Sequence, residues 1–191
     1  GILIGLVLVL GLWVMSAYNG LVTLDQKTLS QWAQVENAYQ RRADLIPNLV
    51  ETVKGAAAFE KETFTAVTEA RSKVGQVQLG SNPASDPAAF AKFQQAQDGL
   101  SSALSRLMVV VEKYPDLKAT QNFRDLQAQL EGTENRIAVE RMRFNETAQA
   151  FNTKRMSFPT VMIAGFFGSR FNEKVYFKAQ AGADTAPAVK F

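Results

Sequence analysis

The side chains with the greatest chemical capability in this chain are arginines and carboxylates concentrated in two short stretches. Residues 41–44 and 131–136 together supply Arg41, Arg42, Asp44, Glu131, Glu134 and Arg136. Carboxylates with arginines beside them more often pair structurally than take part in catalysis. We therefore predict an ion network between helices, and the alternative is a pocket for a ligand or a metal ion.

The residue types absent from the sequence exclude several classes of site. The chain has no histidine and no cysteine. It therefore lacks the usual zinc ligands, thiolate nucleophiles, iron–sulfur ligands and histidine-dependent triads. The glycines form no phosphate-binding loop of the GxGxxG or GxxxxGK[ST] type. An enzyme that uses carboxylates, lysine, serine or tyrosine is not excluded, but we predict no catalytic residue, no cofactor and no metal site.

One carboxylate occupies an unusual position in a helical pattern. Apolar residues recur every three or four positions and predict a helix over about residues 116–156. Glu140 lies on this apolar stripe with Thr133 and Thr147, and burying it without a partner would be costly. We predict an inter-helix pair with an arginine or a register-setting polar layer, and the alternative is a functional carboxylate. A glycine in the middle of a helix costs about 1 kcal/mol of stability relative to alanine. We therefore expect Gly132 to have a packing role, which is to permit close approach of a neighbouring helix.

The helices that must position these residues follow from spacing and capping signals. An unbroken apolar seam over residues 90–114 predicts one helix, with Asp86 as its cap and Pro87 in its first turn. Before it, a break falls either at Asp44 or near Gly55. We favour Gly55, because it gives four helical stretches of roughly 31, 22, 27 and 41 residues outside the membrane. The predicted fold is all-α, an antiparallel up-down four-helix bundle.

The N-terminus carries a long apolar run. Residues 1–24 contain no charge, and a helix of this length reaches about 36 Å, enough to cross a hydrocarbon layer of about 30 Å. A signal peptide is the alternative, but the run is long and Met15-Ser16-Ala17 matches a cleavage site poorly. The positive-inside rule favours an N-out, C-in orientation. The residues predicted to lie in the membrane are Ile2, Leu3, Ile4, Leu6, Val7, Leu8, Val9, Leu10, Leu12, Trp13 and Val14.

The C-terminal region is apolar and basic. Its apolar run, residues 158–168, is too short to span a bilayer, so it is either an interfacial anchor or a strap that covers the core. A fourth helix that returns toward the membrane favours the anchor. The residues predicted to lie at the interface are Phe158, Phe166, Phe167, Lys154, Arg155 and Arg170. The basic tail is either attracted to anionic lipid headgroups or simply solvated, and the sequence favours neither. Nucleic-acid binding is not predicted, because the sequence lacks a dense basic face.

These patterns divide the chain into four parts. They are a transmembrane helix (1–24), a helical bundle (25–157), an apolar and basic membrane-proximal segment (158–178) and a flexible tail (179–191).

Three strings in the sequence resemble the LemA family of bacterial membrane proteins. They are QRRADLIPNLVETVKG at residues 40–55, YPDLKATQNFRDLQAQLEGTENRIAVERMRFNETAQAFN at residues 114–152, and the FP…IAGFFG segment from residue 158. The resemblance implies a single N-terminal membrane helix followed by an antiparallel four-helix bundle. It supplies no catalytic residues, and the pair Phe144-Asn145 stands where a Tyr-Asn pair is expected.

The function predicted from the sequence is that of a non-enzymatic, membrane-anchored scaffold. We expect it in the bacterial inner membrane as a single-pass protein, with the lipid bilayer, further copies of itself and other membrane proteins as partners. Self-association is expected from Gly1, Gly5 and Gly11 in the span and from Phe144 and Phe151, which a long fourth helix would leave uncovered. The alternatives are a ligand-sensing bundle that acts through a partner and an oligomer that remodels membranes.

Overall fold

In the computed structural model, residues 1–56 and 61–178 are described, and within them the chain is helical and contains no strand. Residues 179–191, predicted as a flexible tail, lie outside the described residues. The elements are α1 (Ile2–Ala56), α2 (Lys61–Gly75), η1 (Pro83–Ser85), α3 (Pro87–Val111), α4 (Pro115–Lys118), α5 (Gln121–Met156), α6 (Thr160–Phe166) and η2 (Gly168–Phe171), where η denotes a 3-10 helix.

Helix α1 is a single rod that includes both the apolar N-terminal run and the first amphipathic segment. Its 55 residues rise about 80 Å in total. Pro47 lies inside the helix without ending it, so the break falls at the Gly55 alternative. Among the described residues, α1 is the one helix long and apolar enough to cross a membrane. Its side chains are exposed up to Ser16, except for the half-buried Trp13, and packing against the rest of the chain begins at Ala17.

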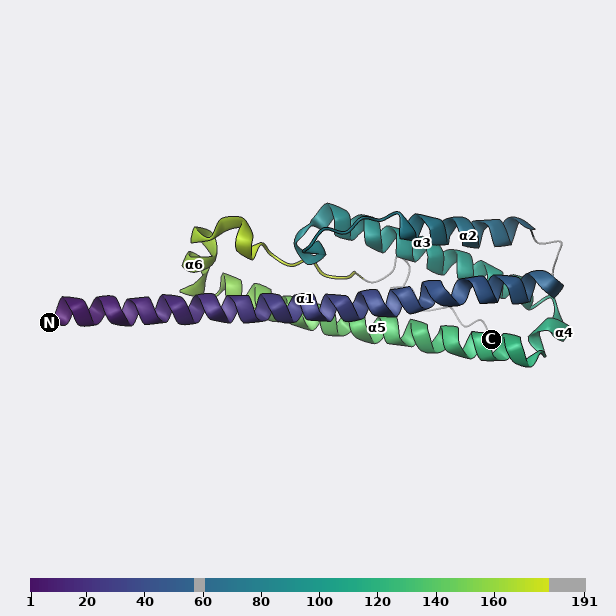
Figure 1. Ribbon diagram of the computed structural model, residues 1–191, viewed down its shortest axis with the longest axis horizontal. Helices are drawn as coiled ribbons and strands as arrows, with labels where there is room; N and C mark the ends of the chain where they lie inside the picture. The colour runs from purple at the N-terminus through teal and green to yellow at the C-terminus, as the bar shows by residue number, and fades with distance from the viewer. Residues whose placement is uncertain (57–60, 179–191) are drawn as a thin grey trace, which may run out of the picture.

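The four longer helices lie side by side in two pairs. Helix α5 lies along α1, and α2 lies along α3. Figure 1 shows α1 and α3 running in one direction and α2 and α5 in the other. Far from the N-terminus, apolar side chains of all four helices and of α4 share one core. It consists of Ile46, Leu49, Val53, Phe64, Val67, Leu100, Ala103, Leu104, Leu107, Val111, Leu117, Phe123 and Leu130.

The predicted start of α3 is confirmed. The Asp86 carboxylate accepts hydrogen bonds from the backbone N–H groups of Ala88 and Ala89, both at 3.0 Å, and Pro87 occupies the first turn. An N-terminal carboxylate also interacts favourably with the helix dipole. Local sequence signals therefore suffice to place this helix end.

Two helix predictions were wrong in extent. The helix expected over residues 116–156 is divided into α4 and α5, because Thr120 caps α5 by accepting a hydrogen bond from the Phe123 N–H. The second helix, expected to have roughly 22 residues, has 15 and ends at Gly75. Val77 and Leu79 beyond it pack against an aromatic cluster, so this part of the chain contributes to the core without remaining helical.

Near the N-terminal half of α1, the chain folds back as α6, η2 and an extended segment, residues 172–178. Gly168, whose φ is +52°, occupies the left-handed conformation that joins α6 to η2. Phe171 is buried with Leu21 and Phe151, and Phe177 is buried with Phe144 in the aromatic cluster. The expectation that Phe144 and Phe151 need a second molecule to cover them was therefore wrong.

Candidate functional site

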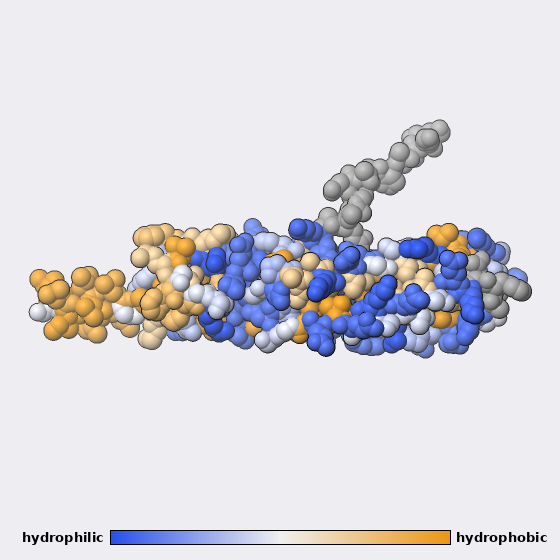
Figure 2. Space-filling view, turned by 90° about the horizontal axis from the view of Figure 1, so that it is seen from above, coloured by the Kyte–Doolittle hydropathy of each residue, from blue (hydrophilic) through white to orange (hydrophobic). Residues whose placement is uncertain are grey.

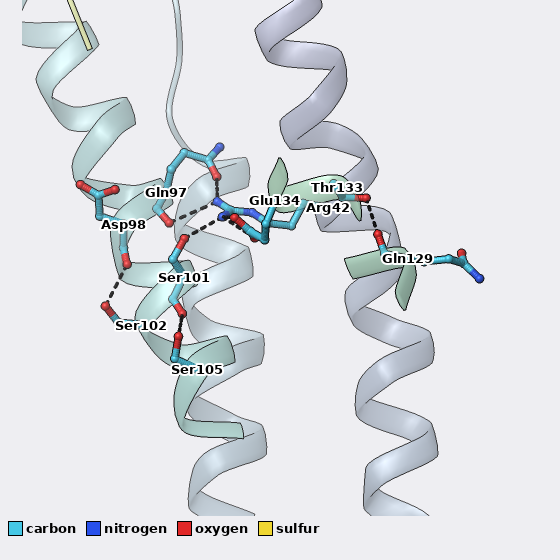
Figure 3. A network of polar contacts seen from close by, with 9 residues as sticks. All are labelled: Arg42, Gln97, Asp98, Ser101, Ser102, Ser105, Gln129, Thr133 and Glu134. Carbon is cyan, nitrogen blue, oxygen red and sulfur yellow. Dashed lines mark hydrogen bonds and ion pairs between the residues drawn. The ribbon is translucent and has the colours of Figure 1, made fainter. Parts of the chain in front are cut away.

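Arg42 is buried where α1, α3 and α5 meet. Its Nη1 donates to Ser101 Oγ at 2.7 Å and to Glu134 Oε1 at 3.0 Å. Its Nη2 donates to the side-chain and backbone oxygens of Gln97, at 2.5 and 3.2 Å. The guanidinium also lies 5.0 Å from the centre of the Tyr39 ring. Figure 3 shows this single side chain reaching both neighbouring helices, so it fixes their relative register.

The other charged residues of the two predicted stretches do not join this network. Asp44 accepts a hydrogen bond from Gln40 of its own helix, and Glu131 accepts one from Gln127. Arg136 pairs with Glu140 of its own helix. Arg41 is exposed. The predicted six-residue network therefore reduces to the Arg42–Glu134 pair, because Asp44, Glu131 and Arg136 bond within their own helices.

Glu140 is buried, but its charged partners lie on its own helix. Its Oε1 lies 2.7 Å from Arg136 Nε and 3.4 Å from Arg143 Nη1, one turn to either side. The contact with another helix comes from a neutral amide, since Gln31 Nε2 of α1 donates to Glu140 Oε2 at 2.6 Å. The predicted inter-helix pair with an arginine was wrong. Thr133 and Thr147 bond to backbone carbonyls of α5, so the polar contact that this stripe makes with α1 comes from Glu140 and Gln31.

A groove of about 990 Å³ lies between α1 and α5. It is lined by Arg41, Asp44, Gly132, Thr133 and Arg136 together with amide side chains of Gln34, Asn37, Gln40 and Gln129. A methyl group at Gly132 would meet nothing within 4 Å. The prediction that Gly132 permits a close helix contact was wrong, because this glycine faces open space in the groove.

A second ion pair is completely buried near the point where α1 begins to pack against the rest of the chain. Lys174 Nζ lies 2.5 Å from Asp25 Oδ1, and both side chains are 0% exposed. The ammonium also donates to Ser85 Oγ at 2.9 Å and lies 4.8 Å from the centre of the Phe151 ring. Arg170 approaches the other Asp25 oxygen at 4.0 Å. Asp25 is the first charged residue after the apolar run, and this pair joins α1 to the C-terminal segment.

Residues 172–178 are held on α5 by asparagine side chains. Asn152 accepts from the Lys174 N–H at 2.8 Å and donates to the Lys174 carbonyl at 2.9 Å. Asn145 makes the same two bonds with Phe177, at 2.9 and 3.0 Å. On the other side, the Val175 N–H donates to the carbonyl of Ala84 at 2.8 Å. Sequence reasoning missed this arrangement, although two asparagines seven residues apart share a helix face.

The aromatic cluster beneath this segment surrounds Trp32. The Trp32 ring centre lies 5.5 Å from those of Phe90 and Phe144 and 5.9 Å from that of Phe177. Phe144, which replaces the tyrosine expected from the resemblance, is fully buried among apolar rings. A hydroxyl-bearing side chain would need a hydrogen-bond partner at this position.

Tyr39 lies at the edge of the cluster, against Phe93 and Arg42. Burial raises the pKa of its phenol above the ordinary value, while Arg141 and Arg42 oppose this change. The phenol is therefore neutral at physiological pH. Among the described residues, no group of three or more acidic, cysteine or histidine side chains is arranged to hold a metal ion.

The residues predicted at the membrane interface lie next to the start of the buried part of α1. The Phe167 ring centre lies 4.8 Å from that of Tyr18. Phe158 and Phe166 are 81% and 86% exposed, whereas Ile163 and Ala164 of α6 are buried. Lys154 and Arg170 are exposed, and Arg155 donates to the carbonyl of Phe171. Figure 2 shows the hydrophobic surface of the N-terminal rod continuing onto the wider part of the molecule beside it.

Comparison with known proteins places these features in a family. Magnetosome protein MamQ 2 of Paramagnetospirillum magneticum and magnetosome protein MamQ of Magnetospirillum gryphiswaldense are each 27% identical over 188 residues, covering 90% of this chain and 68% of theirs. Protein LemA of Metamycoplasma hominis is 25% identical over 130 residues, covering 68% of this chain and 55% of its own. The model of the LemA family matches residues 31–191, most of the chain, and the protein therefore belongs to the LemA family.

Proposed function

We propose that this protein is a non-enzymatic, membrane-anchored helical scaffold of the bacterial envelope that assembles with itself. The observation that carries the proposal is the continuity of α1. One unbroken helix extends from exposed apolar residues into the core shared with α2, α3 and α5. Such a rod transmits the position and tilt of the anchor to the rest of the molecule, because no flexible joint separates them.

The segment around α6 supports attachment to the membrane surface. Phe158, Met162 and Phe166 project their apolar side chains outward beside the α1 residues at which packing begins. Lys154 and Arg170 flank them, and aromatic and basic side chains together favour the headgroup region. In this proposal the protein crosses the inner membrane once, N-out and C-in, and α6 rests on the inner surface of the bilayer.

The two buried polar clusters support a scaffold role, since their charged side chains hold helices and the C-terminal segment together. Arg42 links α1 to α3 and α5, and Asp25 links α1 to the C-terminal segment. We propose that the four longer helices form the antiparallel up-down bundle that the sequence predicts.

Self-assembly is supported by the exposed apolar face of α1. A methyl group at Gly5 or Gly11 would meet nothing within 4 Å, so both glycines offer open surface to a second span. The test is mass photometry of detergent-solubilised protein, with and without the pair of changes Gly5→Leu and Gly11→Leu. We expect an oligomer that shifts toward monomer in the variant, and a monomeric unmodified protein would contradict the proposal.

A ligand-sensing domain that acts through a partner is the second candidate, and the groove beside Gly132 favours it. Its amide side chains, with Arg41 and Arg136, would suit a polar ligand. The change Gly132→Leu would place a bulky side chain in the groove without disturbing the apolar core. The test compares the proteins that co-purify with the unmodified chain and with this variant from native membranes. If the same partner proteins are recovered in the same amounts, the candidate is excluded.

A further inference from the structure

Residues 172–178 contact the rest of the molecule as a bound peptide would. The segment is neither helix nor strand, and side chains of α5 satisfy its backbone groups at Lys174 and Phe177. Farther along, the carbonyl of Lys178 accepts from Arg141 of α5 and Gln94 of α3. The bonds to backbone atoms do not depend on which side chains the peptide carries.

The spacing of the two asparagines matches an extended peptide. Asn145 and Asn152 are seven residues apart on α5, which is about 10.5 Å at 1.5 Å per residue. Their targets, Lys174 and Phe177, are three residues apart in an extended chain, which is about 10 Å. Because these lengths agree, each asparagine meets one peptide unit with both its donor and its acceptor. The pair therefore sets the register of whatever segment lies on α5.

Two side chains of the segment enter selective pockets. Lys174 meets Asp25 and Ser85, and Phe177 inserts among Trp32, Phe90 and Phe144. Between them, Val175 is half-buried and Tyr176 is at the surface. The groove formed by α1, η1, α3 and α5 thus accommodates a lysine and, three residues later, an aromatic side chain of the extended segment.

The groove is costly to leave empty. Asp25 is 0% exposed and has Lys174 as its close cation, so removal of the segment would leave a carboxylate without its partner beside apolar residues. The rings around Trp32 would also lose the Phe177 side chain that packs against them. Replacement of the segment is therefore favoured only when the incoming segment supplies the same lysine and the same aromatic ring.

We propose that this groove is a peptide-binding site whose occupant can come from a second copy of the chain, by reciprocal exchange of residues 158–178. An identical copy supplies every contact again, which makes such exchange a low-cost route to a dimer. Two copies held in one bilayer have their grooves at the same height, which raises their effective concentration. This inference rests on the proposed self-assembly and specifies the contact that joins the copies.

The absence of cysteine from the sequence permits a direct test. Gln94 donates to the carbonyl of Lys178 at 3.2 Å, and both side chains reach the surface. One copy carries Gln94→Cys and one epitope tag, the other carries Lys178→Cys and a different tag, and both are expressed in the same membranes. A short bismaleimide is then added, and the products are separated under denaturing conditions.

Exchange predicts a cross-linked dimer that carries both tags, with a yield at least severalfold above that from either single variant expressed alone. The double variant on one chain serves as the reference for cross-linking within a copy. If it cross-links only internally and the mixed copies give no dimer, exchange is overturned. A second pair, Arg141→Cys with Lys178→Cys, tests the same contact from α5, because Arg141 donates to the Lys178 carbonyl at 2.6 Å, and it guards against a local failure to fold.

Two variants of the Lys178→Cys copy show whether the groove chemistry drives exchange. Lys174→Ala should lower the two-tag yield severalfold, while Lys174→Arg, which keeps the cation, should retain most of it. Equal yields for both variants would overturn the proposed recognition. Mass photometry separates this inference from the proposed function, because an oligomer without two-tag cross-links contradicts exchange alone, whereas a monomer contradicts both.

Discussion

Two buried cations hold this molecule together in different ways. Arg42 shares its donors among Ser101, Gln97 and Glu134, and the Glu134 side chain is 42% exposed. Lys174 has one close charged partner, Asp25, and neither side chain reaches solvent. The Arg42 cluster joins α1 to α3 and α5 within the core, whereas the Asp25–Lys174 pair fastens the C-terminal segment to the N-terminal half of α1.

The difference in exposure determines what each cluster tolerates. When Arg42 is removed, Glu134 can take up water in place of the lost bond. When Lys174 is removed, Asp25 has no such access and keeps only the longer contact with Arg170, at 4.0 Å. A buried charge that loses its close partner is far more costly than an exposed one. We therefore expect the two ion pairs, although similar in chemistry, to respond very differently to substitution.

The largest effect is expected from Lys174→Met, which keeps an unbranched side chain, shorter by one atom, but removes its charge. It should lower the free energy of unfolding by about 3–5 kcal/mol, because the buried Asp25 carboxylate loses its close cation and keeps only the contact with Arg170 at 4.0 Å. The protein is unfolded with urea in detergent, and unfolding is monitored by the fluorescence of Trp32. All the proteins compared carry Trp13→Phe, so that Trp32 is the one remaining tryptophan.

A compensating change tests the cause of that loss. Adding Asp25→Asn to Lys174→Met removes the stranded charge and should restore much of the lost stability. If the double variant is no more stable than Lys174→Met, the buried charge is not the source of the effect.

Arg42→Met is expected to have an intermediate effect, a loss of about 2 kcal/mol. It removes hydrogen bonds to Gln97 and Ser101, but the acid in this cluster remains partly solvated. The same unfolding experiment applies. A loss equal to or greater than that of Lys174→Met would contradict the contrast between the two clusters.

Glu134→Gln isolates the exposed half of the Arg42 cluster. The amide can still accept a hydrogen bond, and partly exposed ion pairs contribute little, so the expected loss is at most about 1 kcal/mol. Its matched counterpart, Asp25→Asn alone, should cost more because Lys174 is then buried beside neutral partners. If Glu134→Gln and Asp25→Asn lower the free energy of unfolding by similar amounts, solvent exposure is not what makes the two clusters differ.

The two clusters also differ in how far the sequence predicts them. The Arg42–Glu134 pair was among the contacts expected between two helical segments, because apolar spacing fixes which faces of those segments meet. The same reasoning failed for Arg41, Asp44 and Arg136, since spacing does not determine which way a long side chain turns at the edge of a stripe. The cap at Asp86 was predictable because its partners are two and three residues away.

The contact between Asp25 and Lys174 was beyond such reasoning. It depends on the path of residues 172–178, which have no helical or strand period, and on side chains that come together only after all the helices have packed. Asn145 and Asn152 gave a weak signal as two amides on one face of α5. Their role became clear only from the peptide units they bind.

The smallest expected effect concerns Tyr39, which lies beside the Arg42 cluster. Burial raises the pKa of its phenol, so the folded state holds the proton more tightly than the unfolded chain, whose phenol titrates near 10.0. The stability associated with this proton is fully present below pH 10 and is lost as the pH rises above it. Unfolding free energies are to be compared at neutral pH and above pH 10 for the unmodified protein and for Tyr39→Phe. Every other ionisable group is common to both proteins, so the difference between them isolates Tyr39. The variant should lose less stability at high pH, and parallel profiles would mean that ionisation of this buried phenol does not contribute.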